Sequence, residues 1–289
     1  MRIDDSSILD HLEGRSPCPK CGKSRKYFCY TCYVPVQQLH GHIPMVKLPI
    51  KIDIIKHKKE IDGKSTAIHA AILAPEDVQI FTYPDIPSYC KDEKTVLIFP
   101  SATSVPINDI LNDNYQVRNP DEGLGKGFHY GTMLRKPIVE SNLENIDVNN
   151  RHELKDLPIT KAVFIDSTWS QSRGIYQDER IQNLKCVVLQ HRISQFWRYQ
   201  RGSPRWYLAT IEAIHQFLLE LHILIWGVNN NYNGLQNLGL KYNYKLPKHA
   251  QGLIESYSGQ YDNLLYFFKH MYDIIHTLYE HDTLKSYKR

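Results

Sequence analysis

The sequence predicts an α/β protein in which a mostly parallel sheet carries helices on both faces. The first observation is a set of short apolar runs, such as 95–99 and 162–165, that are typical of buried strands. The second is that segments with helical spacing of apolar residues, near 107–113, 170–180 and 206–225, separate these runs. Strands that alternate with helices favour a parallel sheet within a three-layered α/β domain.

The individual elements follow from periodicity and from capping and breaking residues. A short helix is expected at 5–13, with Ser6 or Ser7 as its cap. Alternating apolar residues predict a strand at 46–55, and helical spacing predicts a helix at 65–73 that Pro75 ends. A final long helix, about 260–286, carries an apolar stripe that is typical of a packing surface. Further strands are expected at 78–81, 95–99, 162–165 and 186–189.

Three regions are expected along the chain. Residues 1–40 hold a short helix and a cysteine-rich module, and residues 41–228 form the α/β domain. Within that domain, 114–160 is rich in Asn, Asp, Gly and Glu and is predicted to be an excursion from the core. Residues 229–289 combine an Asn-rich loop with a C-terminal helix that packs on the core.

Composition excludes several classes of protein. The 289 residues carry a net charge of +4, which is compatible with an anionic partner but does not require one. No apolar stretch is long enough to span a membrane, and the polar start lacks the core of a signal peptide. Six cysteines in a chain of this length do not suggest a secreted disulfide scaffold. A reducing compartment, the nucleus or the cytosol, is therefore expected.

Two Cys-x-x-Cys pairs near the start of the chain are separated by seven residues. Four thiolates can close the tetrahedral shell of a structural zinc ion and leave no position for a substrate. A redox dithiol is the alternative for a single pair, but two pairs so close together favour zinc. The predicted zinc ligands are Cys18, Cys21, Cys29 and Cys32.

Basic and aromatic residues surround these cysteines, and such a mixture suits contacts with phosphates and bases. A solvated surface on a module with little core explains the same residues equally well. We interpret the module as an RNA-facing ribbon. The residues are Arg15, Lys20, Lys23, Arg25, Lys26, Tyr27, Phe28, Tyr30 and Tyr33.

The segment 166–175 concentrates polar chemistry at the end of a predicted strand. It begins with Asp166, directly after the apolar run 162–165. Strand ends in α/β sheets are common positions for ligand sites. A helix N-cap explains Asp166 or Ser167 alone, but it does not require the whole array. The candidate site residues of this segment are Asp166, Ser167, Thr168, Trp169, Gln171, Ser172 and Arg173.

The pattern Asp166-x-Thr168-Trp169 resembles the signature of the DTW-domain family, whose members are tRNA-uridine aminocarboxypropyltransferases. The resemblance is closest to its eukaryotic members of the first type. The cysteine quartet, a His57-x-x-Glu60 segment, a strand ending in Phe-Pro and a Thr-x-Glu-Ala helix start occur in the family's order, from about residue 18 to about 224. The resemblance implies that 41–228 is a catalytic domain with a SPOUT-type fold and a trefoil knot, and it favours the nucleus as location.

Two further segments are candidate walls of a pocket for a nucleoside donor. The turn at 100–104 offers hydroxyls after a strand, although a plain turn explains it equally well. In the segment 189–213, Thr210 is expected to cap a helix whose N-terminus would face an anion, and capping alone is the alternative. The donor-binding candidates are Ser101, Thr103, Leu189, Leu208, Thr210 and Glu212.

The resemblance implies S-adenosylmethionine as donor and a uridine of the tRNA D-loop as acceptor. Asp166 is the candidate proton acceptor for uridine N3, provided that burial raises its pKa above the ordinary value of about 3.9. Trp169 is expected either to stack on the base or, more in keeping with tryptophan, to belong to the core. Arg198 corresponds to an arginine of the family and is a candidate for a carboxylate or a phosphate. His57 and Glu60 are expected to scaffold the loop rather than to bind a metal.

Two alternatives remain open on the sequence. One is a methyltransferase that uses the same donor on RNA, and the other is a non-catalytic zinc-ribbon protein that binds tRNA. The first would release S-adenosylhomocysteine, and the second would release no product.

Overall fold

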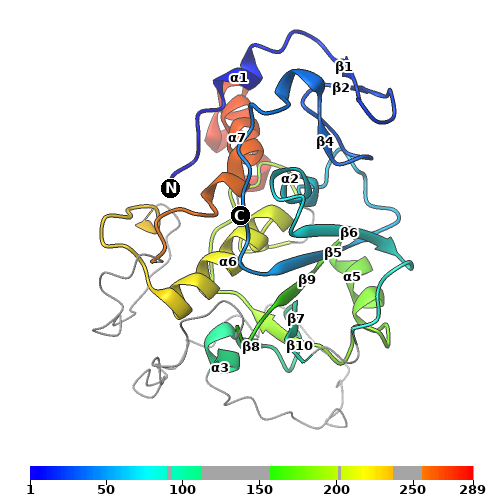
Figure 1. Ribbon diagram of the computed structural model, residues 1–289, viewed down its shortest axis with the longest axis vertical. Helices are drawn as coiled ribbons and strands as arrows, with labels where there is room; N and C mark the ends of the chain where they lie inside the picture. The colour runs from blue at the N-terminus through cyan, green and yellow to red at the C-terminus, as the bar shows by residue number, and fades with distance from the viewer. Residues whose placement is uncertain (90–92, 112–156, 201–202, 237–255, 289) are drawn as a thin grey trace.

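The computed structural model describes residues 1–89, 93–111, 157–200, 203–236 and 256–288. Within these residues, six strands form one parallel sheet in the order β6-β5-β9-β7-β10-β8 (Figure 1). This arrangement confirms the predicted α/β class with a parallel sheet. The trefoil knot stays a prediction. The strands are β5 (Lys51–His57), β6 (Val78–Tyr83), β7 (Thr95–Ile98), β8 (Val105–Pro106), β9 (Lys161–Asp166) and β10 (Lys185–Val188).

Apolar side chains cover both faces of the sheet because successive residues of a strand point to opposite sides. In β9, Ala162 and Phe164 belong to the larger core, whereas Val163 belongs to a second, smaller core on the other face. Strands buried on both faces have nearly continuous apolar sequences. That is why the apolar runs predicted the strands well.

Helices cover each face of the sheet. The larger core contains α2 (Ala67–Leu73), α3 (Ile107–Leu111) and α6 (Thr210–Trp226), and α6 is buried along most of its length. The smaller core contains α5 (Trp169–Tyr176), which contributes Ile175. None of the helices in these described segments combines the length and apolarity that crossing a bilayer requires.

The cysteine module consists of two short antiparallel pairs of strands. β1 (Ser16–Pro17) pairs with β2 (Ser24–Arg25), and β3 (Phe28–Cys29) pairs with β4 (Val34–Pro35). The module lies beside α1 (Ser7–Asp10) and α7 (Tyr266–Leu278) (Figure 1). The ring of Phe28 packs 4.8 Å from that of Phe267 on α7. The first helix is shorter than predicted, and Ser6, its N-cap residue, makes no side-chain capping bond. A 3₁₀ turn, η1 (Gln37–Leu39), follows β4.

The predicted long C-terminal helix is wrong in its extent. A 3₁₀ turn, η6 (Asp262–Leu265), precedes α7, and after Leu278 the chain continues as η7 (His281–Thr283) and η8 (Lys285–Tyr287). Tyr287 Oη donates to the carbonyl oxygen of Gln195 at 2.9 Å, so the chain end folds back instead of extending the helix. The apolar stripe is therefore buried only in its first half, and Leu278 is 68% exposed.

Two other predictions have different outcomes. The strand expected at 46–55 begins only at Lys51, because Val46 and Leu48 donate their N–H groups to residues other than a neighbouring strand. The excursion at 114–160 lies almost wholly outside the described residues.

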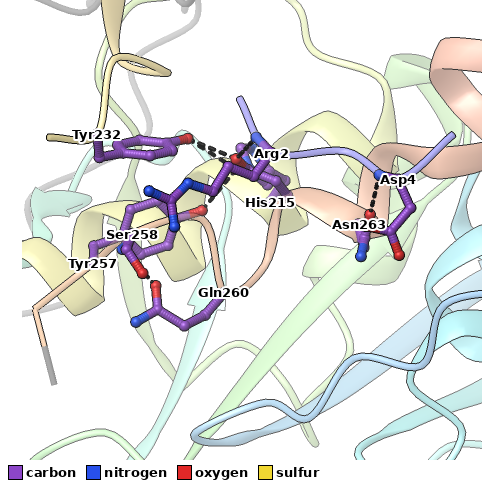
Figure 2. A network of polar contacts seen from close by, with 9 residues as sticks. Arg2, Asp4, His215, Tyr232, Tyr257, Ser258, Gln260 and Asn263 are labelled. Atoms are coloured by element: carbon purple, nitrogen blue, oxygen red, sulfur yellow. Dashed lines mark hydrogen bonds and ion pairs between the residues drawn. The ribbon is translucent and has the colours of Figure 1, made fainter. Parts of the chain in front are cut away.

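Arg2 at the chain start, His215 on α6 and Tyr232 converge in Figure 2, and the group that they share is the buried carboxylate of Asp262 in η6. It accepts hydrogen bonds from the backbone N–H of Arg2 at 2.5 Å, from Tyr257 Oη at 2.8 Å and from Tyr232 Oη at 2.8 Å. His215 Nε2 lies 3.0 Å from the same carboxylate. Burial alone would raise the pKa of Asp262, but the contacts with His215 together with the hydrogen bonds from Arg2 and Tyr232 leave the pKa below its ordinary value.

Replacing Asp262 by alanine is expected to lower the free energy of unfolding by about 3–5 kcal/mol, because several buried donors lose their hydrogen-bond acceptor at once. Asn263→Ala is the matched control, since Asn263 accepts one exposed bond from Asp4 and should cost less than about 1 kcal/mol. Urea unfolding of both variants measures the difference. Equal midpoints for the two variants would contradict a structural role for Asp262.

Candidate functional site

A cavity of about 1300 Å³ opens at the carboxyl ends of the central strands. Its floor includes the ends of β7, β9 and β10, represented by Phe99, Asp166 and Leu189. Parallel strands end at one edge of a sheet, which is where open α/β sheets bind ligands. The volume exceeds the range of about 300–1,000 Å³ typical of small-molecule pockets, so two ligands can be accommodated together.

Asp166 lies at the end of β9, lines this cavity and is 5% exposed. Ser65 Oγ donates to its Oδ2 at 2.7 Å, and Thr210 Oγ1 donates to its Oδ1 at 2.6 Å. Since each carboxylate oxygen has two lone pairs, one on each oxygen remains for a ligand. The two hydroxyls hold the carboxylate in one orientation.

The environment shifts Asp166 toward the protonated form. Burial raises the pKa of its carboxyl, while the hydrogen bonds from Thr210 and Ser65 and the charge of Lys56 lower it, and the net shift is upward. Lys56 itself is 8% exposed and pairs with Asp62 at 2.5 Å. A carboxylate with a raised pKa is a better proton acceptor than an ordinary aspartate.

Much of the segment 167–173 lines the cavity, but not all of it. Thr168 is the N-cap residue of α5, and its N–H donates to Gln171 Oε1 at 3.1 Å. Gln171 is not among the residues that line the cavity, so its side chain completes a capping box instead. The lining residues of this segment are Ser167, Thr168, Trp169, Ser170, Ser172 and Arg173.

Trp169 is half-buried and lies in an aromatic wall of the cavity. Its ring centroid is 4.3 Å from that of Tyr207 and 6.3 Å from that of Phe99. Tyr207 also lines the cavity. Trp169 therefore has features of both expected roles. Its ring packs on aromatic neighbours, as in a core, and it also borders the cavity, where a base could stack on it.

Residues from 189–200 and 203–210 supply a further wall of the cavity. Leu189, Leu208 and Thr210 line the cavity, as does the half-buried Arg198. Arg198 Nη2 is 3.5 Å from the carbonyl oxygen of Gly63, and burial lowers the pKa of this guanidinium. It remains charged at neutral pH, as arginines do in proteins.

Glu212 is fully buried and does not line the cavity, but its carboxylate holds residues of this wall in place through hydrogen bonds. It accepts from Ala209 N–H at 2.9 Å, from Ser194 Oγ at 2.6 Å and from Gln195 N–H at 2.8 Å. The expected cap of the helix is therefore wrong in detail: Ala209 is the N-cap residue, and Thr210 turns its hydroxyl to Asp166. Thr210 is the first residue of α6 rather than its cap, and its hydroxyl serves Asp166 instead of a backbone N–H group.

The turn after β7 contributes less than expected. Ser101 is buried and its hydroxyl lies 3.3 Å from that of Thr103, and neither residue is among those lining the cavity. Phe99 and Pro100 face the cavity in their place.

Sequence reasoning did not predict the roles of Ser65 and Thr66, and it gave Glu60 only a scaffolding role. Ser65 was expected only as the beginning of a helix, yet it donates to Asp166. Thr66 lines the cavity and its Oγ1 accepts the N–H of Ile211, which joins the start of α2 to the start of α6. Glu60 lines the cavity as well, and burial together with the charge of Asp166 raises the pKa of its carboxyl. The His57-x-x-Glu60 pattern was the only signal for this second carboxyl group.

The four cysteines of the module converge as predicted. Their sulfur atoms all lie within 4.8 Å of one another, and Cys21 Sγ is 3.6 Å from Cys29 Sγ. Tetrahedral zinc with bonds of about 2.3 Å requires sulfurs roughly 3.8 Å apart, so Cys18, Cys21, Cys29 and Cys32 fit such an ion. Burial would raise the pKa of Cys29, but the N–H of Thr31 and the side chain of Arg25 lower it to about 6. Thiolate character of this kind suits a metal ligand.

Comparison with known proteins gives consistent matches. The DTW domain family model matches residues 26–276. A human protein named tRNA-uridine aminocarboxypropyltransferase 1 is 44% identical over 265 residues, which cover 91% of this chain and 77% of the human protein. A protein of the same name from Xenopus tropicalis is 41% identical over 281 residues, covering 95% of this chain and 85% of that protein. No solved structure matches the chain significantly.

Proposed function

This chain belongs to the DTW domain family, and on that premise we propose that it is a tRNA-uridine aminocarboxypropyltransferase. It transfers the 3-amino-3-carboxypropyl group of S-adenosylmethionine to N3 of a uridine in the tRNA D-loop. The products are 3-(3-amino-3-carboxypropyl)uridine and methylthioadenosine. The observation that carries the proposal is the identity of 41–44% with enzymes of that name over more than nine-tenths of the chain.

The reaction is a displacement at carbon. The N3 lone pair forms a bond to the methylene carbon beside the sulfonium, and the carbon–sulfur bond breaks with its electron pair going to sulfur. The proton of N3 passes to a carboxylate. A methyl group is bonded to the same sulfonium, so the product depends on which carbon lies in line with N3, about 3–3.5 Å away.

Asp166 is the proposed proton acceptor. It borders the cavity, it carries a raised pKa, and each of its oxygens retains a lone pair beside the bond from Ser65 or Thr210. Buried carboxylates with raised pKa values suit proton transfer near neutral pH. Ser65 and Thr210 keep the carboxylate in place during the transfer.

The remaining walls offer matching groups for the two substrates. Trp169 and Tyr207 provide an aromatic surface for a base. Arg198 is suited to a carboxylate or phosphate, and the beginning of α6 directs the positive end of its helix dipole toward the same volume. We place the amino-acid arm of the donor between Arg198 and α6.

Zinc is the ion we propose for the cysteine cluster, with a structural role. All four ligands are sulfur, so a tetrahedral ion has no open position for chemistry. The module is distinct from the cavity that contains Asp166, because none of the cysteines lines it.

The decisive experiment is incubation of the protein with tRNA and S-adenosylmethionine, followed by mass spectrometry of both the nucleosides and the released sulfur compound. We expect acp3-uridine and methylthioadenosine in equal amounts. Release of S-adenosylhomocysteine would instead indicate a methyltransferase, and tRNA binding without any product would indicate a non-catalytic binder.

The pH dependence of the reaction reports the state of Asp166. Below its raised pKa, Asp166 is protonated and cannot accept the N3 proton, so kcat is expected to fall on the acid side at a pH above the ordinary value of about 3.9. The bond from Thr210 lowers that pKa, so Thr210→Val should move the acid limb to higher pH. Profiles of kcat against pH for both proteins measure the shift, and a limb that moves to lower pH would contradict Asp166 as the titrating group.

A further inference from the structure

A second pocket, of about 160 Å³, lies between the cysteine module, the beginning of α2 and the segment 196–198. We call it the module pocket. It shares Lys64, Ser65, Thr66, Phe196 and Arg198 with the large cavity, so the two volumes are neighbours with a common wall. Nothing in the proposed reaction uses the module pocket itself.

The inside of the module pocket combines aromatic rings with two buried polar atoms that have no partner among the described residues, Nδ1 of His69 and Nε of Arg25. Phe28, Phe196 and Trp197 line it, and the rings of Phe196 and Trp197 are 5.3 Å apart. His69 lines it too and is 3% exposed, and its Nδ1 has no hydrogen-bond partner among the described residues. Buried polar atoms are almost always paired in folded proteins, so this one indicates a missing partner.

The state of His69 defines what that partner can be. Burial lowers the pKa of its imidazole to about 3, so the ring is neutral at physiological pH. A neutral imidazole has one donor and one acceptor nitrogen, so the unpaired Nδ1 can pair with a donor or an acceptor on the polar edge of a base. The ring centroid of Phe28 lies 5.5 Å from that of His69, so an apolar surface adjoins the polar group.

The rim of the module pocket is strongly basic. Arg15, Lys26 and Lys64 are exposed there, and Arg198 stands in the wall shared with the large cavity. Asp62 is the only acidic residue in its lining, and Lys56 pairs with it. Cations around an aromatic interior are typical of sites for single-stranded nucleic acid.

We propose that the module pocket binds the base of a nucleotide adjacent to the target uridine. This inference rests on the proposed function. The base contacts Phe28 and Trp197 and directs its polar edge to His69, while the phosphate that joins it to the target lies on Lys64, because the proposed function assigns Arg198 to the donor. The volume is close to that of a cavity of about 150 Å³ that holds benzene, so it suits a single pyrimidine-sized ring. The cysteine module thereby selects the sequence or shape beside the modified position.

The test is a double-mutant cycle on binding, which does not require turnover. Fluorescence anisotropy compares a D-loop stem-loop with versions that carry an abasic site on either side of the target uridine. For the unmodified protein, we expect one of the two abasic sites to weaken binding roughly 5- to 150-fold, the range for loss of one stacked base. Trp197→Ala should bind the intact RNA as weakly as the unmodified protein binds the abasic RNA. In this variant the same abasic site should cause no further loss of affinity.

Controls separate the pocket from the fold and from the proposed reaction. His69→Phe keeps an aromatic ring and removes the nitrogen. In this variant too, the abasic site should weaken RNA binding less than it does in the unmodified protein, which tests the pocket even if Trp197→Ala proves unstable. Tyr279→Ala, which removes an aromatic ring that is 55% exposed and lies outside both pockets, should bind RNA normally. Binding of S-adenosylmethionine, measured by calorimetry, should be unchanged in all three variants.

Each outcome has one meaning. The inference is overturned if the substitution and the abasic site weaken RNA binding additively, or if neither abasic site weakens binding. The proposed function still stands in that case, provided that the unmodified protein forms acp3-uridine. Non-additive losses in a protein that binds tRNA but forms no product would support the pocket and overturn the proposed function. Failure of the protein to bind any RNA would overturn both.

Discussion

Asp166→Asn is expected to reduce kcat by a factor of about 10²–10⁴, the usual contribution of a positioned proton acceptor. The amide has nearly the shape of the carboxylate, and its oxygen can still accept from Ser65 or Thr210, so the cavity should keep its form. It has no basic oxygen that could take a proton from N3. Single-turnover formation of acp3-uridine measures the loss, and the dissociation constant for S-adenosylmethionine should change little.

Two further variants make this prediction specific. Asp85→Asn alters an exposed aspartate that does not line the cavity, so its kcat should equal that of the unmodified protein. Glu60→Gln alters the second carboxyl group of the cavity, and we expect a smaller loss than with Asp166→Asn. The reverse order of the two losses would transfer the role of proton acceptor to Glu60.

Cys29→Ser is expected to release the bound metal and to detach the cysteine module from the core. Structural zinc contributes about 10–16 kcal/mol of apparent binding free energy in small modules, and the hairpins β1–β2 and β3–β4 have little core of their own. Wild-type protein should contain one zinc ion per chain by elemental analysis, and the variant should contain none. The variant should also unfold at a lower temperature, because Phe28 would lose its place against Phe267.

Cys186 provides the matched control for that experiment. It is buried in β10, and it is not part of the cysteine cluster. Cys186→Ala should therefore keep one zinc ion per chain. Retention of a full equivalent of zinc by Cys29→Ser would exclude the four-sulfur site.

The sheet was predictable because its signals are local. Strands buried on both faces need apolar residues at every position, so runs such as 95–98 and 162–165 identify β7 and β9 without knowledge of their neighbours. The cysteine cluster was predictable for a similar reason, since each Cys-x-x-Cys knuckle is itself a local metal-binding turn. The position of Asp166 at a strand end follows from the run that precedes it.

Capping was harder to predict because several residues compete for the same N–H groups. Thr210 has the sequence signature of an N-cap, but the helix takes Ala209 as its N-cap residue and the threonine hydroxyl donates to Asp166. The same competition places Gln171 at the beginning of α5 instead of in the cavity. The C-terminal helix ends early for a comparable reason, since Tyr287 bonds to the carbonyl oxygen of Gln195, 92 residues away.

The amino-acid sequence by itself determined the class of fold, the grouping of four cysteines and the family to which the chain belongs, because these depend on residue types at short, regular spacings. Only the tertiary structure decided what surrounds Asp166. Ser65 lies 101 residues before it and Thr210 lies 44 residues after it, and no periodicity links positions so far apart. Their convergence depends on the order of strands in the sheet, which brings the beginnings of α2 and α6 to one edge, and this order is set by packing of the whole core.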